Sequence, residues 1–227
     1  MVKKKVKKKA SNQAAARIPT EKQIGEGLYF DFEGFGSNKY MDNPTPVLCG
    51  YRFGGSGPVR FAVFNDAFRW AAEAEKSGLV EFVGRGEKKK DFLMDLIERR
   101  TRGGKKVFYY SSHEKDEFDR ILGIQIRRRL RDVRRIMKKT IPGLRHGERT
   151  LINYCGEAGI DVPLDYGKGE VTKKFRNVRD YSKTRSGWSN APAGIVKQWQ
   201  LILDHNRFDV ESMYHLVRRV VQMNKKS

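Results

Sequence analysis

The chain has 227 residues, long enough for one sizeable domain whose apolar core needs no disulfide or structural metal. No apolar stretch approaches the roughly 18 residues of a membrane span, and no apolar segment of a secretory signal follows the N-terminal lysines. The two cysteines, Cys49 and Cys155, form no C-x-x-C pair. This argues against a zinc ribbon or a disulfide framework and favours a reducing cytoplasm.

Net charge narrows the class of partner. The chain has 47 Lys and Arg residues against 27 Asp and Glu residues, a net charge of +20. Residues 1–22 contain eight basic residues and one acidic residue, so residues 23–227 still carry a net charge of +13. A cationic body as well as a cationic N-terminus predicts a polyanionic partner, and we expect nucleic acid. The alternative is a charge surplus that only keeps the protein soluble.

Residues 1–22 are predicted to form a disordered basic arm ahead of a single domain, residues 23–227. Lysine clusters in this segment repel one another, and the Ala/Ser/Asn/Gln stretch after them has no periodic apolar face. Such an arm suits contact with phosphate groups, contact with a membrane surface, or solubility alone. The sequence leaves these three roles open.

The rest of the sequence predicts an α/β fold, a mixed sheet flanked by helices. We expect strands at residues 27–33, 47–53 and 59–64, helices at 66–76 and 89–102, a strand at 107–110, and helices at 115–122, 124–139 and 148–158. An irregular region at 163–192 and two helices at 193–203 and 206–223 complete the chain. A leading hairpin followed by α/β crossovers is typical of a mixed sheet with helices packed on it.

Asp31 and Glu33 stand within the aromatic first strand, residues 27–33. Side chains two positions apart on a strand point to the same face, so these carboxylates are expected side by side. Like charges that close together resist ionisation, and divalent cations remove this cost. Mg²⁺ prefers a few carboxylates together with water and phosphate oxygens. The pair therefore predicts a metal site, the alternative being two solvated acids on an exposed strand.

Glu114 follows the buried strand at residues 107–110 and is the third candidate acid. Residues just past such a strand lie at the carboxyl edge of the sheet, where the functional sites of α/β folds gather. Asp116 and Asp119 are close in sequence and remain alternatives. Glu114 is also explained as an acid at a helix N-terminus, where the helix dipole favours it.

Asp209 and His205 are the candidates near the C-terminus. They are four residues apart, so they share a helical face if the helix already includes His205. An acid that binds a metal, with a histidine one turn before it, is a workable arrangement for proton transfer. The alternative is an ordinary helix start with capping acids.

The order of these acids resembles that of the DEDD-type exonucleases of the RNase H-like superfamily, and more closely the RNase H-like domains associated with RecB-type nucleases. The resemblance covers residues 26–223 and rests on residues 28–34, 107–114 and 206–211, with weaker similarity at residues 150–160. It implies two bound ions held by Asp31, Glu33, Glu114 and Asp209. Its general base is a His five residues, or a Tyr four residues, before the last acid, whereas here His205 stands at the tyrosine spacing.

Basic residues concentrate in two further segments. Residues 124–149 contain ten basic and two acidic residues. As a helix, this segment buries an apolar stripe and turns its arginines outward, which suits phosphate contacts better than a solvated face of mixed sign. Lysines and arginines also mix with aromatics at residues 173–188, as in single-strand binders. The residues predicted to bind nucleic acid are Arg127, Arg128, Arg131, Arg134, Arg135, Lys138, Lys139, Lys173, Lys174 and Arg176.

Together these features predict a nuclease that depends on two Mg²⁺ or Mn²⁺ ions and hydrolyses phosphodiester bonds of DNA or RNA. The expected ligands are Asp31, Glu33, Glu114 and Asp209, with His205 as the base. The resemblance implies a 3′-5′ exonuclease, and an endonuclease stays open. The alternative is a catalytically inactive RNase H-like module that binds nucleic acid through its basic surface.

Overall fold

Six strands pair into one mixed sheet in the order β4-β3-β2-β1-β5-β6. They are β1 (Leu28–Glu33), β2 (Leu48–Phe53), β3 (Arg60–Val63), β4 (Val80–Phe82), β5 (Val107–Tyr109) and β6 (Leu130–Asp132). Strands β1, β2 and β3 are antiparallel neighbours, whereas β1–β5, β5–β6 and β3–β4 are parallel pairs. This computed structural model describes residues 18–35, 45–99, 102–122, 126, 128–141, 143–163, 166, 170–184 and 187–225. The predicted α/β class with a mixed sheet is confirmed.

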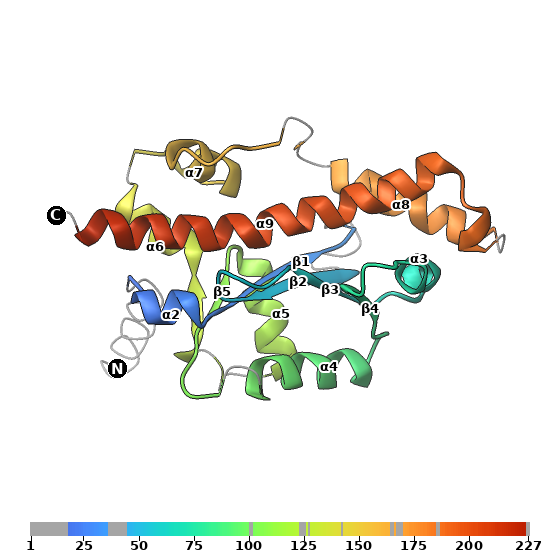
Figure 1. The fold of residues 1–227 in the computed structure, drawn as a ribbon, viewed down its shortest axis with the longest axis horizontal. Coiled ribbons are helices and arrows are strands. Elements are labelled where there is room, and N and C mark those ends of the chain that lie inside the picture. Colours follow the sequence, from blue (N-terminus) through green and yellow to red (C-terminus); the bar gives the residue numbers. More distant parts are fainter. Residues whose placement is uncertain are drawn as a thin grey trace, which may run out of the picture.

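Helices cover both faces of the sheet (Figure 1). The long helix α9 (Ala193–Lys225) crosses one face, where α6 (Val133–Thr140), α7 (Leu151–Glu157) and α8 (Glu170–Ser182) pack against it. Helices α4 (Glu87–Met94) and α5 (Ser112–Leu122) cover the other face.

The remaining helical elements are short. They are α2 (Glu21–Gly25), η1 (Asp66–Phe68), α3 (Arg69–Glu73), the π-helical turn η2 (Asp95–Arg99), η4 (His146–Glu148) and η5 (Trp188–Asn190). Among the helices that the structure describes, none combines the length and the apolar character needed to cross a membrane.

Alternation along β1 decides which way its acids point. Phe30 and Phe32 belong to the apolar cluster on the α4/α5 side of the sheet. Tyr29 belongs to the cluster on the α9 side. Because successive strand residues face opposite sides, Asp31 and Glu33 face α9.

The helix predicted at residues 124–139 is wrong for the described residues before Val133, whereas residues 124, 125 and 127 lie outside the described residues. Residues 130–132 form the edge strand β6, which pairs with β5 through Leu130 and Val107. The helix α6 begins only at Val133, because the side chain of Asp132 caps it by accepting a hydrogen bond from the Arg135 backbone N–H. The apolar spacing favoured one helix, since a three-residue strand is too short to show its own period.

Two further predictions need correction toward more helix. The region 163–192, predicted to be irregular, contains α8, which buries Val171, Phe175 and Val178 at helical spacing. The two helices predicted on either side of residues 204–205 are one continuous helix, α9. The polar run there does not cap a new helix, because the side chain of Asn206 bonds across to β1. Strand β4 was not predicted.

The predicted boundary of the basic arm at residue 22 falls inside a helix. Thr20 caps α2, and Thr20 and Gln23 bond reciprocally to each other's backbone N–H in a capping box. Lys225 at the end of α9 forms an ion pair with Glu21, 2.7 Å between Nζ and Oε1. Residues 1–17 of the predicted arm lie outside the described residues.

Candidate metal centre

Two of the predicted acids stand at the end of β1, on the sheet face that α9 covers. Asp31 is 8% exposed, and the side chain of Glu33 is 16% exposed. Burial at this position follows from the sheet order, because β1 lies between β2 and β5 and α9 crosses above it. Both carboxylates are therefore held in a protein interior rather than on a solvated strand face.

Helix α9 presents His205, Asn206 and Asp209 to these two acids. Because α9 is continuous, His205 and Asp209 are one turn apart on the same face. The sequence predicted this shared face for a helix that already includes His205. The Asn206 amide donates a hydrogen bond to Asp31, 2.6 Å from Nδ2 to Oδ2. Gly50 of β2 leaves space for this side chain, since a Cβ at that position would lie 1.9 Å from Asn206 Oδ1. The close approach of helix to sheet is therefore fixed by a glycine and an asparagine.

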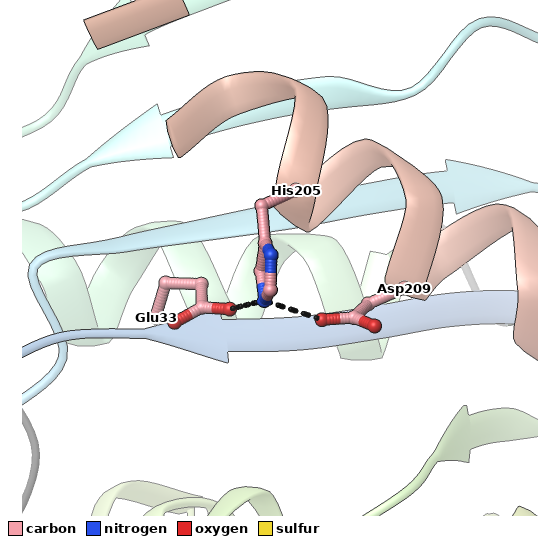
Figure 2. A group of neighbouring side chains, drawn as sticks. All are labelled: Glu33, His205 and Asp209. Atoms are coloured by element: carbon pink, nitrogen blue, oxygen red, sulfur yellow. Dashed lines mark ion pairs between the residues drawn. The ribbon is translucent and has the colours of Figure 1, made fainter. Parts of the chain in front are cut away.

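His205 lies between two carboxylates (Figure 2). Its Nε2 is 3.5 Å from Glu33 Oε1 and 3.5 Å from Asp209 Oδ2. Burial lowers the pKa of His205 to about 4, and the charge of Lys174 adds to this effect. The imidazole is therefore neutral near pH 7 and can accept a proton or donate a lone pair to a cation.

Glu114, in the first turn of α5, joins the group from just past the end of β5. It is 3% exposed, and its Oε2 accepts a hydrogen bond from the Ser111 backbone N–H at 2.7 Å. Its negative charge raises the pKa values of Asp31, Glu33 and Asp209. These four carboxylates are called the acid group below. The alternatives are engaged elsewhere, because Asp116 and Asp119 both pair with Lys115.

The four carboxylates resist ionisation. Burial is the largest cause and raises the pKa of each. Repulsion from neighbouring carboxylates adds to it for Asp31, Glu33 and Asp209, and the pKa of Asp209 reaches about 7 even though a hydrogen bond from Tyr166 lowers it. Packing therefore gathers four carboxyl groups that ionise reluctantly, and a divalent cation bound among them would favour their ionised form.

Tyr166 contributes to the site without having been predicted. Its ring stacks on His205, with centroids 3.9 Å apart, and its hydroxyl bonds to Asp209 Oδ1 and lies 3.1 Å from the His205 carbonyl oxygen. Burial and the charge of Asp209 raise its pKa, so the hydroxyl stays protonated and donates. Nothing near position 166 in the sequence indicates this contact. Asn206 had a weak signal, as a polar residue on a buried helix face.

The described basic residues that were predicted to bind nucleic acid lie on several elements, and not all of them face outward. Arg131 lies in β6, is 9% exposed, and donates to the backbone oxygens of Leu130 and Arg128, so it is not an outward-facing residue. Arg128 is exposed, and Arg127 lies outside the described residues. The others lie on two helices: Arg134, Arg135, Lys138 and Lys139 on α6, and Lys173, Lys174 and Arg176 on α8.

Comparisons of the chain with models of protein families, with curated proteins and with solved structures found no match. The chemistry of this site is therefore inferred from its own residues. Glu33, His205 and Asp209 each offer one ligand atom, and these atoms lie within 4.8 Å of one another. Opposite ligands of one Mg²⁺ ion are about 4.2 Å apart, so small side-chain movements would let these three hold a single ion.

Proposed function

We propose that this chain is a metal-dependent nuclease with an RNase H-like fold, which hydrolyses phosphodiester bonds of DNA or RNA. One observation carries the proposal: the four carboxyl groups of Asp31, Glu33, Glu114 and Asp209 are buried or largely buried, and the charge of Glu114 raises the pKa values of the other three. They come from three separate elements, β1, α5 and α9. A protein that gathers so much uncompensated negative charge gains stability when divalent cations bind there.

The donor set fits such ions. Carboxylate oxygens are the ligands that Mg²⁺ and Mn²⁺ prefer, and a neutral imidazole suits Mn²⁺ as a further ligand. Asp31, Glu33, Glu114 and Asp209 would hold two ions, and the geometry adds His205 beside Glu33 and Asp209. When bound, two such ions supply an activated water and stabilise the leaving oxygen of the phosphodiester.

The side chains of the chain itself orient the site. Where the four carboxylates alone hold the ions, Nε2 of His205, neutral near pH 7, remains open to take a proton from the attacking water. Asn206 fixes the carboxylate of Asp31 through its 2.6 Å hydrogen bond. Tyr166 restrains the ring of His205 by stacking and holds Asp209 through its hydroxyl. The two are positioning residues, since they act through the acids and the histidine.

Charge and architecture support the nucleic-acid substrate and the family. The net charge of +20 favours a polyanion, and several basic residues of α6 and α8 form no ion pair among the described residues and are available for phosphate contacts: Arg134, Lys138, Lys139, Lys173 and Arg176. A mixed sheet that starts with antiparallel strands and continues with parallel ones is consistent with the RNase H-like resemblance. We propose the 3′-5′ direction on that resemblance alone, and a reducing cytoplasm as the compartment because Cys49 and Cys155 are free and buried.

End-labelled single- and double-stranded DNA and RNA, incubated with Mg²⁺, Mn²⁺ or EDTA, test this proposal. We expect a ladder of products on at least one substrate with either metal, shortened from the 3′ end, and none with EDTA. Products shortened from the 5′ end or cut internally would correct the direction but keep the nuclease. Binding without cleavage of any substrate would favour the inactive nucleic-acid-binding module.

A further inference from the structure

A basic pocket lies beside the candidate metal centre, at the carboxyl ends of β5 and β6. Its volume is about 280 Å³. Its lining comes from three parts of the chain: the β5–α5 connection, the helix α6, and the segment that leads into α7. The side chains that matter here are Tyr110, Ser112, Arg134, Lys138, His146 and Arg149.

The pocket carries positive charge that its own lining does not neutralise. Asp132 is its one acidic lining residue, and this carboxylate already caps α6 and pairs with Arg135, 3.1 Å from Nε to Oδ2. Among the residues that the structure describes, Arg134, Lys138 and Arg149 have no carboxylate partner. Three cations from separate turns therefore converge on one hollow, and an anion bound there would accept hydrogen bonds from several directions.

The same short segment borders the pocket and the metal centre. Tyr110 and Ser112 line the pocket, while the backbone N–H of Ser111, between them, bonds to Glu114 of the acid group. Strands β1, β5 and β6 are consecutive in the sheet, and their register places Asp31 one residue beyond the level of Asp132, so the backbones of these two residues are about 10 Å apart. A nucleic-acid strand that runs from the acids across the end of β5 toward β6 would reach the pocket within about three phosphates.

We propose that this pocket binds a single phosphate group of the substrate strand, within about three phosphates of the bond that is cleaved. The inference rests on the proposed nuclease activity and deepens it. Arg134 and Arg149 supply planar guanidinium forks, Lys138 supplies a point charge, and Ser112 supplies a hydroxyl. A phosphate offers oxygens to donors on several sides, whereas a carboxylate of an acidic peptide offers one flat edge.

The phosphate has two possible sources, a terminal phosphomonoester or an internal phosphodiester. Their shared chemistry is a tetrahedral anion, and binding measurements in EDTA distinguish them without cleavage. The probes are single-stranded oligonucleotides of one sequence, in DNA and in RNA, with a hydroxyl at both ends, a 5′-phosphate or a 3′-phosphate. A second set, in DNA, carries one neutral methylphosphonate at each internal position in turn.

Lys138→Gln and Lys139→Gln are the matched variants. Both remove one charge from α6, but Lys138 lines the pocket and Lys139 does not. Arg134→Gln is the second test variant, in case Lys138→Gln alters the helix. Melting temperature and circular dichroism check that each variant is folded.

For an internal phosphate, we expect one methylphosphonate position to weaken binding to the wild type about 10-fold, as loss of a charge-assisted hydrogen bond would. Binding by Lys139→Gln should be weakened at the same methylphosphonate position. Binding by Lys138→Gln and Arg134→Gln should not be, because these variants already lack a contact between the pocket and that phosphate. For a terminal phosphate, one phosphorylated end should tighten binding to the wild type about 10-fold, with the same pattern among the variants.

The proposal is overturned if the variants respond identically to every neutralised position and to both ends, or if no strand binds. It is also overturned if poly-glutamate binds more tightly than the strands and only its binding is lost in Lys138→Gln, which would assign the pocket to an acidic protein. A position-specific effect in EDTA without cleavage in Mg²⁺ or Mn²⁺ would reject the nuclease and keep the phosphate pocket. Cleavage without any position-specific effect would reject the phosphate pocket and keep the nuclease.

Discussion

Glu114 and Glu117 lie on the same helix, α5, and are almost equally buried, at 3% and 6% exposure. Glu117 forms an ion pair with Lys89, 2.7 Å from Oε1 to Nζ, and accepts a hydrogen bond from Arg120. Burial raises its pKa, but these two partners lower it by more, so the net pKa is lowered. Glu114 faces the acid group instead, and its pKa is raised.

The difference between these two glutamates lies in their charged neighbours, and it is what the proposed function of Glu114 rests on. Burial is common to both, so burial alone carries no information about function. What differs is the partner: Glu117 is paired with Lys89, whereas among the described residues no lysine or arginine pairs with Asp31, Glu33, Glu114 or Asp209. Uncompensated buried charge is costly, and a site that keeps it points to a cation supplied from outside the chain.

The strongest test of this contrast is Asp31→Asn, which keeps the shape of the side chain and removes its charge. If the acid group binds catalytic ions, hydrolysis should fall by a factor on the order of 1,000, or about 4 kcal/mol of transition-state stabilisation. Binding in EDTA should be unchanged or slightly tighter, because one repulsion against phosphate is lost. Cleavage rates in Mn²⁺ and affinities in EDTA measure the two effects.

Asp116→Asn is the matched control for that variant. Asp116 lies on α5 near Glu114, but its side chain is 57% exposed and pairs with Lys115. The change should leave hydrolysis within about twofold of the wild type, since surface ion pairs contribute little. Equal losses in the two variants would remove Asp31 from the active site.

A pair of glutamate substitutions on α5 gives the next largest effect. Glu117→Gln should destabilise the protein by about 3 kcal/mol, because it leaves Lys89 buried without its partner. Glu114→Gln should instead stabilise the metal-free protein at pH 8.5 by about 1 kcal/mol, because it relieves repulsion within the acid group. Urea unfolding in EDTA measures both, and changes of the same sign would show that the two glutamates are equivalent.

The smallest predicted effect is the pH dependence of the metal-free protein. The pKa of Asp209 is raised from its ordinary 3.8 to about 7, mainly by burial. Between these values the folded state binds more protons than the unfolded state, so stability falls as pH rises through this range. His205, with its pKa lowered to about 4, acts in the opposite direction: at pH 6.5 it is about half protonated in the unfolded state and neutral in the folded state, so it offsets about half of the Asp209 effect between pH 6.5 and 8.5.

From pH 6.5 to 8.5 we therefore expect the metal-free protein to lose about 1 kcal/mol of stability through Asp209. Mg²⁺ should offset this loss, because bound cations favour the ionised carboxylates. Thermal melts at both pH values, with EDTA or Mg²⁺, measure the effect, and Asp209→Asn should reduce it. A metal-free protein that is equally stable at both values would contradict the uncompensated charge of the site.

Local patterns in the sequence were enough for the first part of the site. Asp31 and Glu33 were paired by strand periodicity within an aromatic run, and the structure places both toward α9. The pairing of His205 with Asp209 depended on one continuous helix, which the polar run at residues 204–207 concealed. The sequence could not show that Asn206 bonds to β1 rather than capping a helix, since its partner Asp31 is 175 positions away.

Long-range contacts decided the rest, and the basic residues show why. Arg131 and Arg134 are three positions apart and would share one face of a predicted helix. Pairing of β6 with β5 places Arg131 in the sheet, where it is buried, while Arg134 lines the pocket beside the acids. Tyr166 likewise reaches His205 only because the chain folds back on α9. Sequence periodicity thus determined the fold class and the pairing of Asp31 with Glu33. Strand pairing and helix packing decided which charged side chains are buried, which are in ion pairs and which can bind a ligand.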